Sequence, residues 1–342
     1  MKHVLVIRLS ALGDVAIMAP LVKAYAEANR DVTFTVAGPP LLEPLFEGEA
    51  NVHYLSLKKK QSFIKIYKAL NAVGADTVID LHRVNRVGFA IITLRLRHLF
   101  NPHFRIFALH KGKVSRWFYL HHLWRKARKP QYVRYDDVFR HAGLKCNNAL
   151  MCKCVSVDMP NTDTITQSHN TAIVGVAPFS QHEGKIWPWE YTERLVLMLA
   201  ERGRKVLLFG SKEEAPQLEA LAVRHENISS VAGRQAFRDE LEIIKGLSLM
   251  VSMDSANMHF ASAMGTPVVS IWGATHPDFG FYGYGQDRAN ALCANLECQP
   301  CSAFGQKPCR YGDYRCLRAI TPEMALEKIE SLLAEKYFCR IG

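Results

Sequence analysis

The stretch HVLVIRLSALGDVAIMAP, residues 3–20, places an apolar run, a short loop and an amphipathic pattern in direct succession. The run HVLVI is short and unbroken, as is typical of a strand buried on both faces of a parallel sheet. After the loop, Val15, Met18, Ala19 and Val22 recur at the period of a helix. A buried strand that leads into a helix is the repeating unit of a parallel α/β sheet. The stretch therefore predicts that an α/β domain begins at this first strand.

The same alternation of apolar runs and helical patterns continues along the chain. A polar, turn-rich segment at residues 158–170 interrupts it and is typical of a linker. We therefore expect two doubly wound α/β domains, the first at residues 1–165 and the second at 166–342. The last helical pattern, residues 322–336, either closes the second domain or crosses back to the first. The expected strands are residues 3–7, 32–37, 77–81, 105–109, 172–177, 206–209, 249–252 and 267–271.

Composition limits the class of protein. The chain has 342 residues, of which 49% are apolar, and such a chain is globular rather than disordered. No apolar run reaches the roughly 18 to 20 residues that a bilayer-spanning helix needs. Nine cysteines, an odd number, fit a reducing compartment better than a disulfide framework. We therefore expect a cytoplasmic protein.

The net charge of +11 is concentrated in one window of the chain. No Asp or Glu occurs between Asp80 and Asp136, whereas this window holds thirteen Lys or Arg residues and six histidines. Arg83 and Arg86 are the first two of these cations. A field of this sign indicates an anionic partner, such as a phosphosugar, a lipid headgroup or a nucleic acid. A plain solvated basic surface is the alternative interpretation.

The loop after the first strand is one candidate site. Ligands of parallel α/β sheets collect at the carboxyl ends of the strands, and Gly13 and Asp14 follow the first strand. Gly13 lets the backbone pass close to a ligand. Asp14 either contacts a ligand or only caps its helix by accepting a backbone N–H. The loop lacks the full G-x-G-x-x-G pattern, so a dinucleotide site is disfavoured.

The second half of the chain repeats this layout with cationic and acidic loops. Lys185 lies in the loop after the strand expected at residues 172–177. It is either a mobile cation suited to a phosphate or a solvent-exposed lysine. Glu213 lies where a strand passes into a helix. Its carboxylate either favours the helix dipole or binds ribose hydroxyls.

A third loop completes the pattern of a nucleotide-diphosphate site. Asp254 ends an expected strand, and Ser255 and Ala256 open the helix that follows. The backbone N–H groups of a first helical turn bind anions, and His259 can add a further donor. Polar groups from several loops then meet at one edge of the sheet, as they do around nucleotide diphosphates.

Together these residues resemble those of the lipopolysaccharide heptosyltransferase family, glycosyltransferase family nine. The matching segments are RLSALGDV, the K-x-W-P loop at Lys185, FGSKEE, MDSANMHFASAMGTPVV and WGATHP, in family order over nearly the whole chain. The resemblance implies a GT-B fold, in which two Rossmann-like domains face each other across a cleft. It also implies an inverting, metal-independent transfer of a sugar without a cofactor. The donor is typically ADP-heptose, and the acceptor is the phosphorylated inner core of lipid A.

The resemblance further implies roles for individual residues. Asp14 would be the general base, and Lys185 would hold the donor phosphate and offset developing charge. Asp254 would bind hydroxyls of the transferred sugar. The other donor-side candidates are Ser180, Gln181, Glu213, Ser255, Ala256 and His259, and the acceptor-side candidates are Ser10, Gly13, Arg83 and Arg86.

The basic window gains a role from this resemblance. Its cations would bind phosphates and carboxylates of the anionic acceptor and hold the enzyme at the inner face of the inner membrane. One position departs from the family pattern: Ala256 stands where the family commonly has Gly after the Asp-Ser pair. The extra methyl narrows the approach to the phosphates, and this bears on the donor's identity more than on the fold.

A group of cysteines near the C-terminal end is a separate candidate site. Cys298, Cys301, Cys309 and Cys316 lie in a short loop-like segment. One C-x-x-C pair followed by two more cysteines can hold structural zinc. The spacing of the last two is irregular, so reduced thiols or an adventitious disulfide are the alternatives.

Two other functions compete with sugar transfer. A nucleotide-sugar epimerase or hydrolase can use the same scaffold, although such an enzyme does not need so basic an acceptor domain. A nucleic-acid-binding protein would account for the sequence pI of about 9.2. No recognition helix, RNP motif or zinc-finger spacing in the sequence supports the second alternative.

Overall fold

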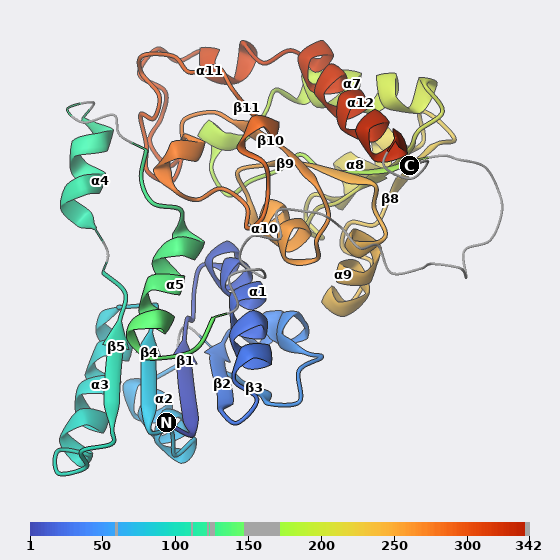
Figure 1. Cartoon of the computed structure of the whole chain (residues 1–342). Helices are drawn as coiled ribbons and strands as arrows, with labels where there is room; N and C mark the ends of the chain where they lie inside the picture. Colours follow the sequence, from blue (N-terminus) through green and yellow to red (C-terminus); the bar gives the residue numbers. More distant parts are fainter. Residues whose placement is uncertain (59–60, 111, 122, 124–126, 147–171, 339–342) are drawn as a thin grey trace. The chain divides into compact units, whose positions relative to one another are not determined.

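The computed structural model describes residues 1–58, 61–110, 112–121, 123, 127–146 and 172–338. Two compact units share these residues (Figure 1). The first comprises Met1–Val114 and Lys129–Cys152, and the second comprises Ser115–Arg128 and Lys153–Gly342. The expected linker at residues 158–170 and the domain boundary at residue 165 lie outside the described residues. Each unit is therefore described by itself.

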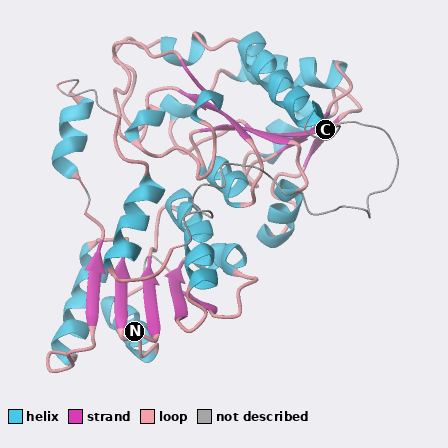
Figure 2. Cartoon of the chain, in the orientation of Figure 1, coloured by secondary structure: helices cyan, strands magenta, loops and turns pink. Residues whose placement is uncertain are grey.

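The first unit is built on a five-stranded sheet in which neighbouring strands run parallel. The strand order is β3-β2-β1-β4-β5. Figure 2 shows these strands side by side, with helices packed around the sheet. The strands are β1 (His3–Ile7), β2 (Thr33–Gly38), β3 (Val52–Ser56), β4 (Thr77–Asp80) and β5 (Arg105–Ala108).

The helices of the first unit bury their apolar faces against this sheet. α1 packs on α5, and α2 packs on α3. Leu5 and Ile7 of β1 share one core with Ile66 of α2 and Leu94 of α3. The helices are α1 (Leu12–Ala28), the 3-10 helix η1 (Pro40–Phe46), α2 (Phe63–Ala72), α3 (Asn85–Arg97) and α5 (Gln131–His141). α4 (Lys113–Leu120) begins in this unit and continues into the second.

The second unit contains a six-stranded sheet, also with parallel pairings throughout. Its strand order is β11-β10-β9-β6-β7-β8. The strands are β6 (Ile173–Ala177), β7 (Lys205–Leu208), β8 (Ile228–Ser230), β9 (Leu249–Met253), β10 (Val268–Trp272) and β11 (Ala291–Cys293). The helices are η2 (Glu183–Lys185), α7 (Trp189–Glu201), α8 (Ala215–Ala222), α9 (Phe237–Lys245), α10 (Ala256–Ala263), η3 (Pro277–Phe279), η4 (Arg288–Asn290), α11 (Arg315–Arg318) and α12 (Pro322–Phe338).

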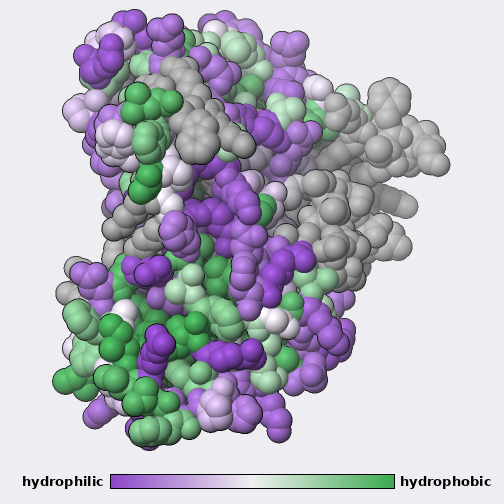
Figure 3. Space-filling model, turned by 60° about the vertical axis from the view of Figure 1, so that its left-hand side comes forward, coloured by the Kyte–Doolittle hydropathy of each residue, from purple (hydrophilic) through white to green (hydrophobic). Residues whose placement is uncertain are grey.

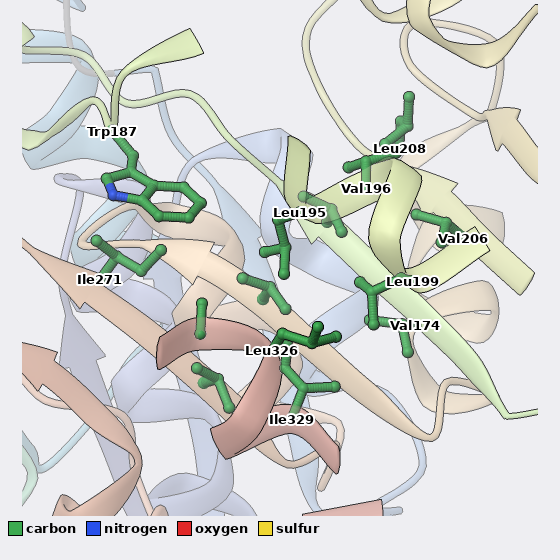
Figure 4. Close-up of a cluster of buried hydrophobic side chains, with 14 of the residues drawn as sticks. Val174, Trp187, Leu195, Val196, Leu199, Val206, Leu208, Ile271, Leu326 and Ile329 are labelled. Atoms are coloured by element: carbon green, nitrogen blue, oxygen red, sulfur yellow. The ribbon is translucent and has the colours of Figure 1, made fainter. Parts of the chain in front are cut away.

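One large apolar core holds the second unit together. Figure 4 shows Leu195 and Leu199 of α7 near Leu326 and Ile329 of α12 in this core. α12 packs on α7 and β10, so the last helix closes the second unit. The indole of Trp187 is 1% exposed and belongs to the same core. Its Nε1 donates to the carbonyl of Ile320 at 2.9 Å, and this bond fixes the loop that follows β6.

Segment 115–128 belongs to the second unit although it lies between elements of the first. The backbone N–H of Arg128 donates to the carbonyl of Asp278 at 2.9 Å. The Arg128 guanidinium lies 5.1 Å from the centre of the Phe279 ring. The Tyr119 ring packs edge-on against the same phenylalanine. These contacts tie the segment to the 3-10 helix η3.

The α/β class and the expected strands are confirmed. All the strands named from the sequence are present, and none of their ends differs from the expected one by more than one residue. The sequence patterns missed β3, β8 and β11. These three strands lie at sheet edges and are short or partly polar, so they carry no continuous apolar run. Within the described residues, no helix is long and apolar enough to cross a bilayer.

Candidate active site

Both sheets reverse their strand order at one point. In the first unit this point lies between β1 and β4, and in the second it lies between β6 and β9. The loops that leave two such strands turn to opposite sides of the sheet and leave a crevice in which ligands bind. Asp14 follows β1, Lys185 follows β6, and Asp254 follows β9. The predicted residues therefore lie at the two switch points.

Asp14 is the third residue of α1 and is held by two contacts. Its Oδ2 accepts a hydrogen bond from the backbone N–H of Ala11 at 3.3 Å. The same oxygen forms an ion pair with the guanidinium of Arg8. The Asp14 side chain is 17% exposed and that of Arg8 is 12% exposed. Asp14 thus does contact the helix end, as the capping alternative predicted, but it also belongs to a largely buried charged pair.

Arg8 is a site residue that the sequence patterns missed. Its guanidinium also donates to the carbonyl of Leu81 and lies 5.8 Å from the centre of the Tyr135 ring. Burial acts to lower the pKa of Arg8, but the nearby Tyr135, Asp14 and Asp80 raise it above its ordinary value. The guanidinium therefore stays charged. It links the end of β1 to the loop after β4 and fixes the direction of the Asp14 carboxylate.

Ser10 pairs with a second residue that the patterns missed, His82. The two side chains meet at 3.1 Å, between Ser10 Oγ and His82 Nε2. The backbone N–H of Leu9 donates to His82 Nδ1 at 3.3 Å. Because Nδ1 accepts a hydrogen bond, the neutral imidazole carries its proton on Nε2 and donates it to Ser10. The Ser10 hydroxyl can then direct its own proton to another acceptor.

The remaining acceptor-side candidates lie around the same loops. Gly13 is in the first turn of α1. Arg83 is exposed in a left-handed backbone conformation, with φ of 49°. Its N–H donates to Asp80 Oδ1 at 2.9 Å. Burial raises the pKa of Asp80, although the N–H groups of Arg83 and His82 oppose this. Arg86 lies in the first turn of α3, and its side chain lies outside the described part.

In the second unit, Lys185 and Asp254 form a nearly buried ion pair. Lys185 Nζ lies 2.8 Å from Asp254 Oδ2, and the two side chains are 14% and 8% exposed. The hydroxyl of Thr275, from the loop after β10, donates to the same Oδ2 at 2.7 Å. The Ser180 hydroxyl donates to the carbonyl of Asp254 at 3.2 Å. The contacts of Lys185 and Thr275 both use Oδ2, and within the described part of the chain no side-chain hydrogen bond to Oδ1 of Asp254 is present.

The stem of Lys185 is confined by a glycine of the cysteine-bearing loop. A Cβ on Gly305 would lie 2.7 Å from Lys185 Cγ and 3.0 Å from Cε. The loop is held in turn by the N–H groups of Cys301 and Ser302, which donate to the carbonyl of Ala274 at 3.1 and 3.2 Å. The side chain of Lys185 is therefore confined by the Gly305 backbone, and the loop that carries Lys185 is anchored by the buried Trp187.

The start of α10 faces the same switch point as Asp254. Ser255 is the N-cap residue of α10 but makes no side-chain capping bond, and its hydroxyl meets that of Ser252 at 3.2 Å. Ala256 is the first residue of the helix, and His259 is buried within it. An uncapped first turn leaves backbone N–H groups for an anion or water. The diphosphate site expected at this helix start remains a prediction.

Two donor-side candidates lie apart from this cluster. Gln181 is exposed in the loop after β6, and Glu213 is exposed in the turn before α8. Backbone N–H groups and Ser211 lower the pKa of Glu213. The neighbouring Glu214, not Glu213, accepts the N–H of Ser211 at 2.7 Å. No contact in the described residues joins Gln181 or Glu213 to Lys185 or Asp254, and their donor contacts remain predictions.

The structure also describes the four cysteines for which the sequence left structural zinc, reduced thiols or a disulfide open. Cys298, Cys301, Cys309 and Cys316 are free thiols. Among the described residues, no three or more His, Cys, Asp or Glu side chains are grouped closely enough to hold a metal ion. Burial acts to raise the pKa of Cys309, but the N–H groups of residues 311–314 outweigh it and lower that pKa. Burial raises the pKa of Cys316 to about 12.

Comparison with known proteins places these observations in a family. A glycosyl transferase family 9 structure from Veillonella parvula covers 98% of both chains with a TM-score of 0.70 at 19% identity. The structure of E. coli ADP-heptose lps heptosyltransferase II covers 98% of this chain and 100% of its own with a TM-score of 0.65, also at 19% identity. The fold is that of GT-B glycosyltransferases. The chain belongs to glycosyltransferase family 9 (heptosyltransferase), whose model matches residues 63–314.

Curated relatives agree with this family. Lipooligosaccharide heptosyltransferase 2 of Haemophilus influenzae is 30% identical over 170 residues, 48% of each chain. The chain thus spans about half the length of that relative. Lipooligosaccharide heptosyltransferase 2 of Campylobacter jejuni O:6 is 20% identical over 333 residues, 94% of this chain and 96% of its own.

Proposed function

We propose that the protein is an inverting glycosyltransferase that moves heptose from ADP-heptose onto the phosphorylated inner core of lipopolysaccharide. The single observation that carries the proposal is the buried cluster of Lys185, Asp254 and Thr275 at the switch point of the second sheet. It combines a cation, a carboxylate with one open oxygen and an uncapped helix start. Family membership gives the reaction class, and one related E. coli enzyme was solved with ADP-2-deoxy-2-fluoro heptose.

On the donor side, each group has a distinct task. As the bond between the sugar carbon and the diphosphate lengthens, negative charge grows on the leaving ADP. The Lys185 ammonium and the first N–H groups of α10 offset this charge. Asp254 Oδ1 accepts hydrogen bonds from hydroxyls of the transferred sugar, while Thr275 and Lys185 hold Oδ2 in place.

On the acceptor side, Asp14 is the general base. An acceptor hydroxyl is a weak nucleophile until a base accepts its proton. Its oxygen forms the new bond to the sugar carbon, its proton passes to Asp14, and ADP departs with the electron pair of the broken bond. The Arg8 guanidinium holds Asp14 in one orientation. Ser10 and the exposed Arg83 are the groups that we assign to acceptor binding.

The acceptor also determines where the enzyme works. Lipid A and its inner core carry phosphates and carboxylates, and the window between Asp80 and Asp136 carries no acid. Cations of this window bind the acceptor and hold the protein peripherally at the cytoplasmic face of an anionic membrane. Family membership disfavours the alternatives of an epimerase, a hydrolase or a nucleic-acid-binding protein.

The test is transfer with defined substrates. The purified protein is incubated with ADP-heptose and a heptose-deficient lipopolysaccharide acceptor, and both ADP release and the mass of the acceptor are followed. Asp14→Asn is expected to abolish transfer while ADP-heptose still raises the Tm of the variant. Lys185→Met is expected to lower both transfer and the Tm increase. Acceptor modification by Asp14→Asn at the wild-type rate would disprove the role of the base.

A further inference from the structure

A row of exposed apolar side chains runs along α3 and into the turn after it. Phe89, Ile92 and Leu96 are 61%, 56% and 64% exposed, and Leu99 and Phe100 that follow are 63% and 94% exposed. At about 3.6 residues per turn, the three helical members fall within about 60° of the helix circumference. We call these five residues the α3 stripe. The three helical members thus share one face of α3, and the other two follow directly after the helix.

The fold does not require the α3 stripe. The opposite face of α3 carries Val87, Ala90, Ile91 and Leu94, which are buried in the core of the first unit. α3 therefore already has the apolar face that packs it onto its sheet. A second apolar face directed to solvent lowers solubility unless it meets a partner, and such patches mark interaction surfaces.

The surroundings of the α3 stripe are cationic. Arg95 and Arg97 are exposed on the two sides of the row. Neither forms an ion pair with an acidic side chain anywhere in the described ranges, and no Asp or Glu occurs from residue 81 to residue 135. Figure 3 brings this side of the first unit forward and shows hydrophobic residues gathered in its lower part, with hydrophilic ones among them.

We propose that the α3 stripe is the surface by which this protein docks on an anionic lipid bilayer. The apolar side chains enter the boundary between headgroups and acyl chains, and Arg95 and Arg97 bind lipid phosphates on either side. This arrangement of an apolar row with flanking cations is what an interfacial helix needs. The inference rests on the proposed peripheral association and assigns a surface to it.

The charge distribution favours lipid over a second copy of the chain. In a symmetric dimer the same patch would face itself. Arg95 and Arg97 would then approach the same cations of the partner copy, with no nearby acid in this window to offset them. An anionic bilayer instead supplies the complementary charge as well as an apolar phase.

The experiment is co-sedimentation of the full chain with vesicles. We compare vesicles of phosphatidylcholine alone with vesicles that also contain phosphatidylglycerol. The wild-type chain is expected to bind the second kind, and Phe89→Ser combined with Leu96→Ser to weaken that binding by about tenfold or more. Arg95→Gln with Arg97→Gln is expected to weaken it by about fivefold per charge and to reduce its salt dependence.

The matched control is Val223→Ser. Val223 is 86% exposed in the second unit, outside the α3 stripe, so the same kind of change there is expected to leave vesicle binding unchanged. Equal binding of the stripe variants and the wild type would overturn the proposal. So would a concentration-dependent dimer on size exclusion that Phe89→Ser dissociates.

Failure of this inference can be told apart from failure of the proposed function. Transfer of heptose to a delipidated, water-soluble core acceptor is measured for the variant with Phe89→Ser and Leu96→Ser, and is expected to stay within about twofold of the wild-type rate. If transfer occurs but the wild-type chain does not bind anionic vesicles, the docking surface is wrong and the proposed transfer stands. If vesicle binding depends on the α3 stripe but no acceptor is modified, the surface stands and the transfer is wrong.

Discussion

Replacement of Gly305 by alanine should displace the Lys185 ammonium, the cation of the proposed donor site, without disturbing the rest of the fold. Gly305 has φ of 80°, and a Cβ there would lie 2.7 Å from Lys185 Cγ. The shortest ordinary van der Waals distance for a Cβ atom is 3.4 Å. The Lys185 stem must therefore retreat by about 0.7 Å or more. A displacement of about 1 Å in a reacting group can cost about 100-fold in rate. We expect Gly305→Ala to lower kcat by between tenfold and 100-fold, roughly.

The chain offers a matched control in the same loop. Gly312 has φ of 75°, and a Cβ there would meet nothing within 4 Å. Alanine in this left-handed conformation costs about 1 to 2 kcal/mol at either position, so both variants should lose similar stability. The assay is kcat and KM for ADP release, together with Tm by differential scanning fluorimetry. If Gly305→Ala and Gly312→Ala lose the same activity, Gly305 does not position Lys185.

Three further outcomes follow from the structure. Thr275→Val removes a hydrogen bond to the buried Asp254 carboxylate, worth about 1.5 to 3 kcal/mol, so kcat/KM should fall about tenfold or more, and Thr275→Ser should restore it. Burial acts to raise the pKa of Asp76, but the hydrogen bonds that its carboxylate accepts from N–H groups and a hydroxyl lower that pKa. Asp76→Asn should therefore lower the Tm at pH values above the ordinary pKa of 3.8, and this difference should disappear as the pH falls through the pKa of the folded state. A Tm difference that does not change with pH would contradict this. Iodoacetamide at neutral pH should label Cys309 before Cys316, because the pKa of Cys309 is lowered and that of Cys316 is raised to about 12. Peptide mapping by mass spectrometry measures the order of labelling.

The sequence predicted the positions of the site better than its contacts. The loops that carry Asp14, Lys185 and Asp254 follow buried strands with continuous apolar runs. Parallel sheets place such loops at the carboxyl edge by necessity, so the location could be inferred from the order of elements alone. The roles of these residues in catalysis came only from the family resemblance and remain proposals.

The partners of these residues could not be inferred in the same way. His82 lies 72 residues from Ser10 in the sequence, and Thr275 lies 21 residues from Asp254. Which loops meet depends on strand order, and a linear pattern of apolar residues does not encode strand order. Arg8 carried one detectable signal: a charged residue directly after a buried strand, six positions before the carboxylate that it pairs with.

The same limit explains why the edge strands were missed. β3 has the sequence VHYLS, and none of its residues is fully buried. A strand that pairs on one side only needs no continuous apolar run, so its composition approaches that of a loop. The assignment of residues 115–128 to the second unit depends on aromatic and backbone contacts with η3, and these also have no local pattern.

The ion pair between Lys185 and Asp254 means that the ammonium of the proposed donor site already has a neighbouring carboxylate that neutralises its charge. An arriving anion has to compete with an internal carboxylate for the same ammonium. Chloride or another simple anion would replace the short, nearly buried contact between Lys185 and Asp254 with a single weaker one. Dissolved salt screens nearly buried charges only slightly. A pyrophosphate can engage the ammonium and the amides of α10 together. In the proposed reaction, this ion pair therefore disfavours the binding of small anions and favours the diphosphate of a sugar nucleotide, which makes both contacts.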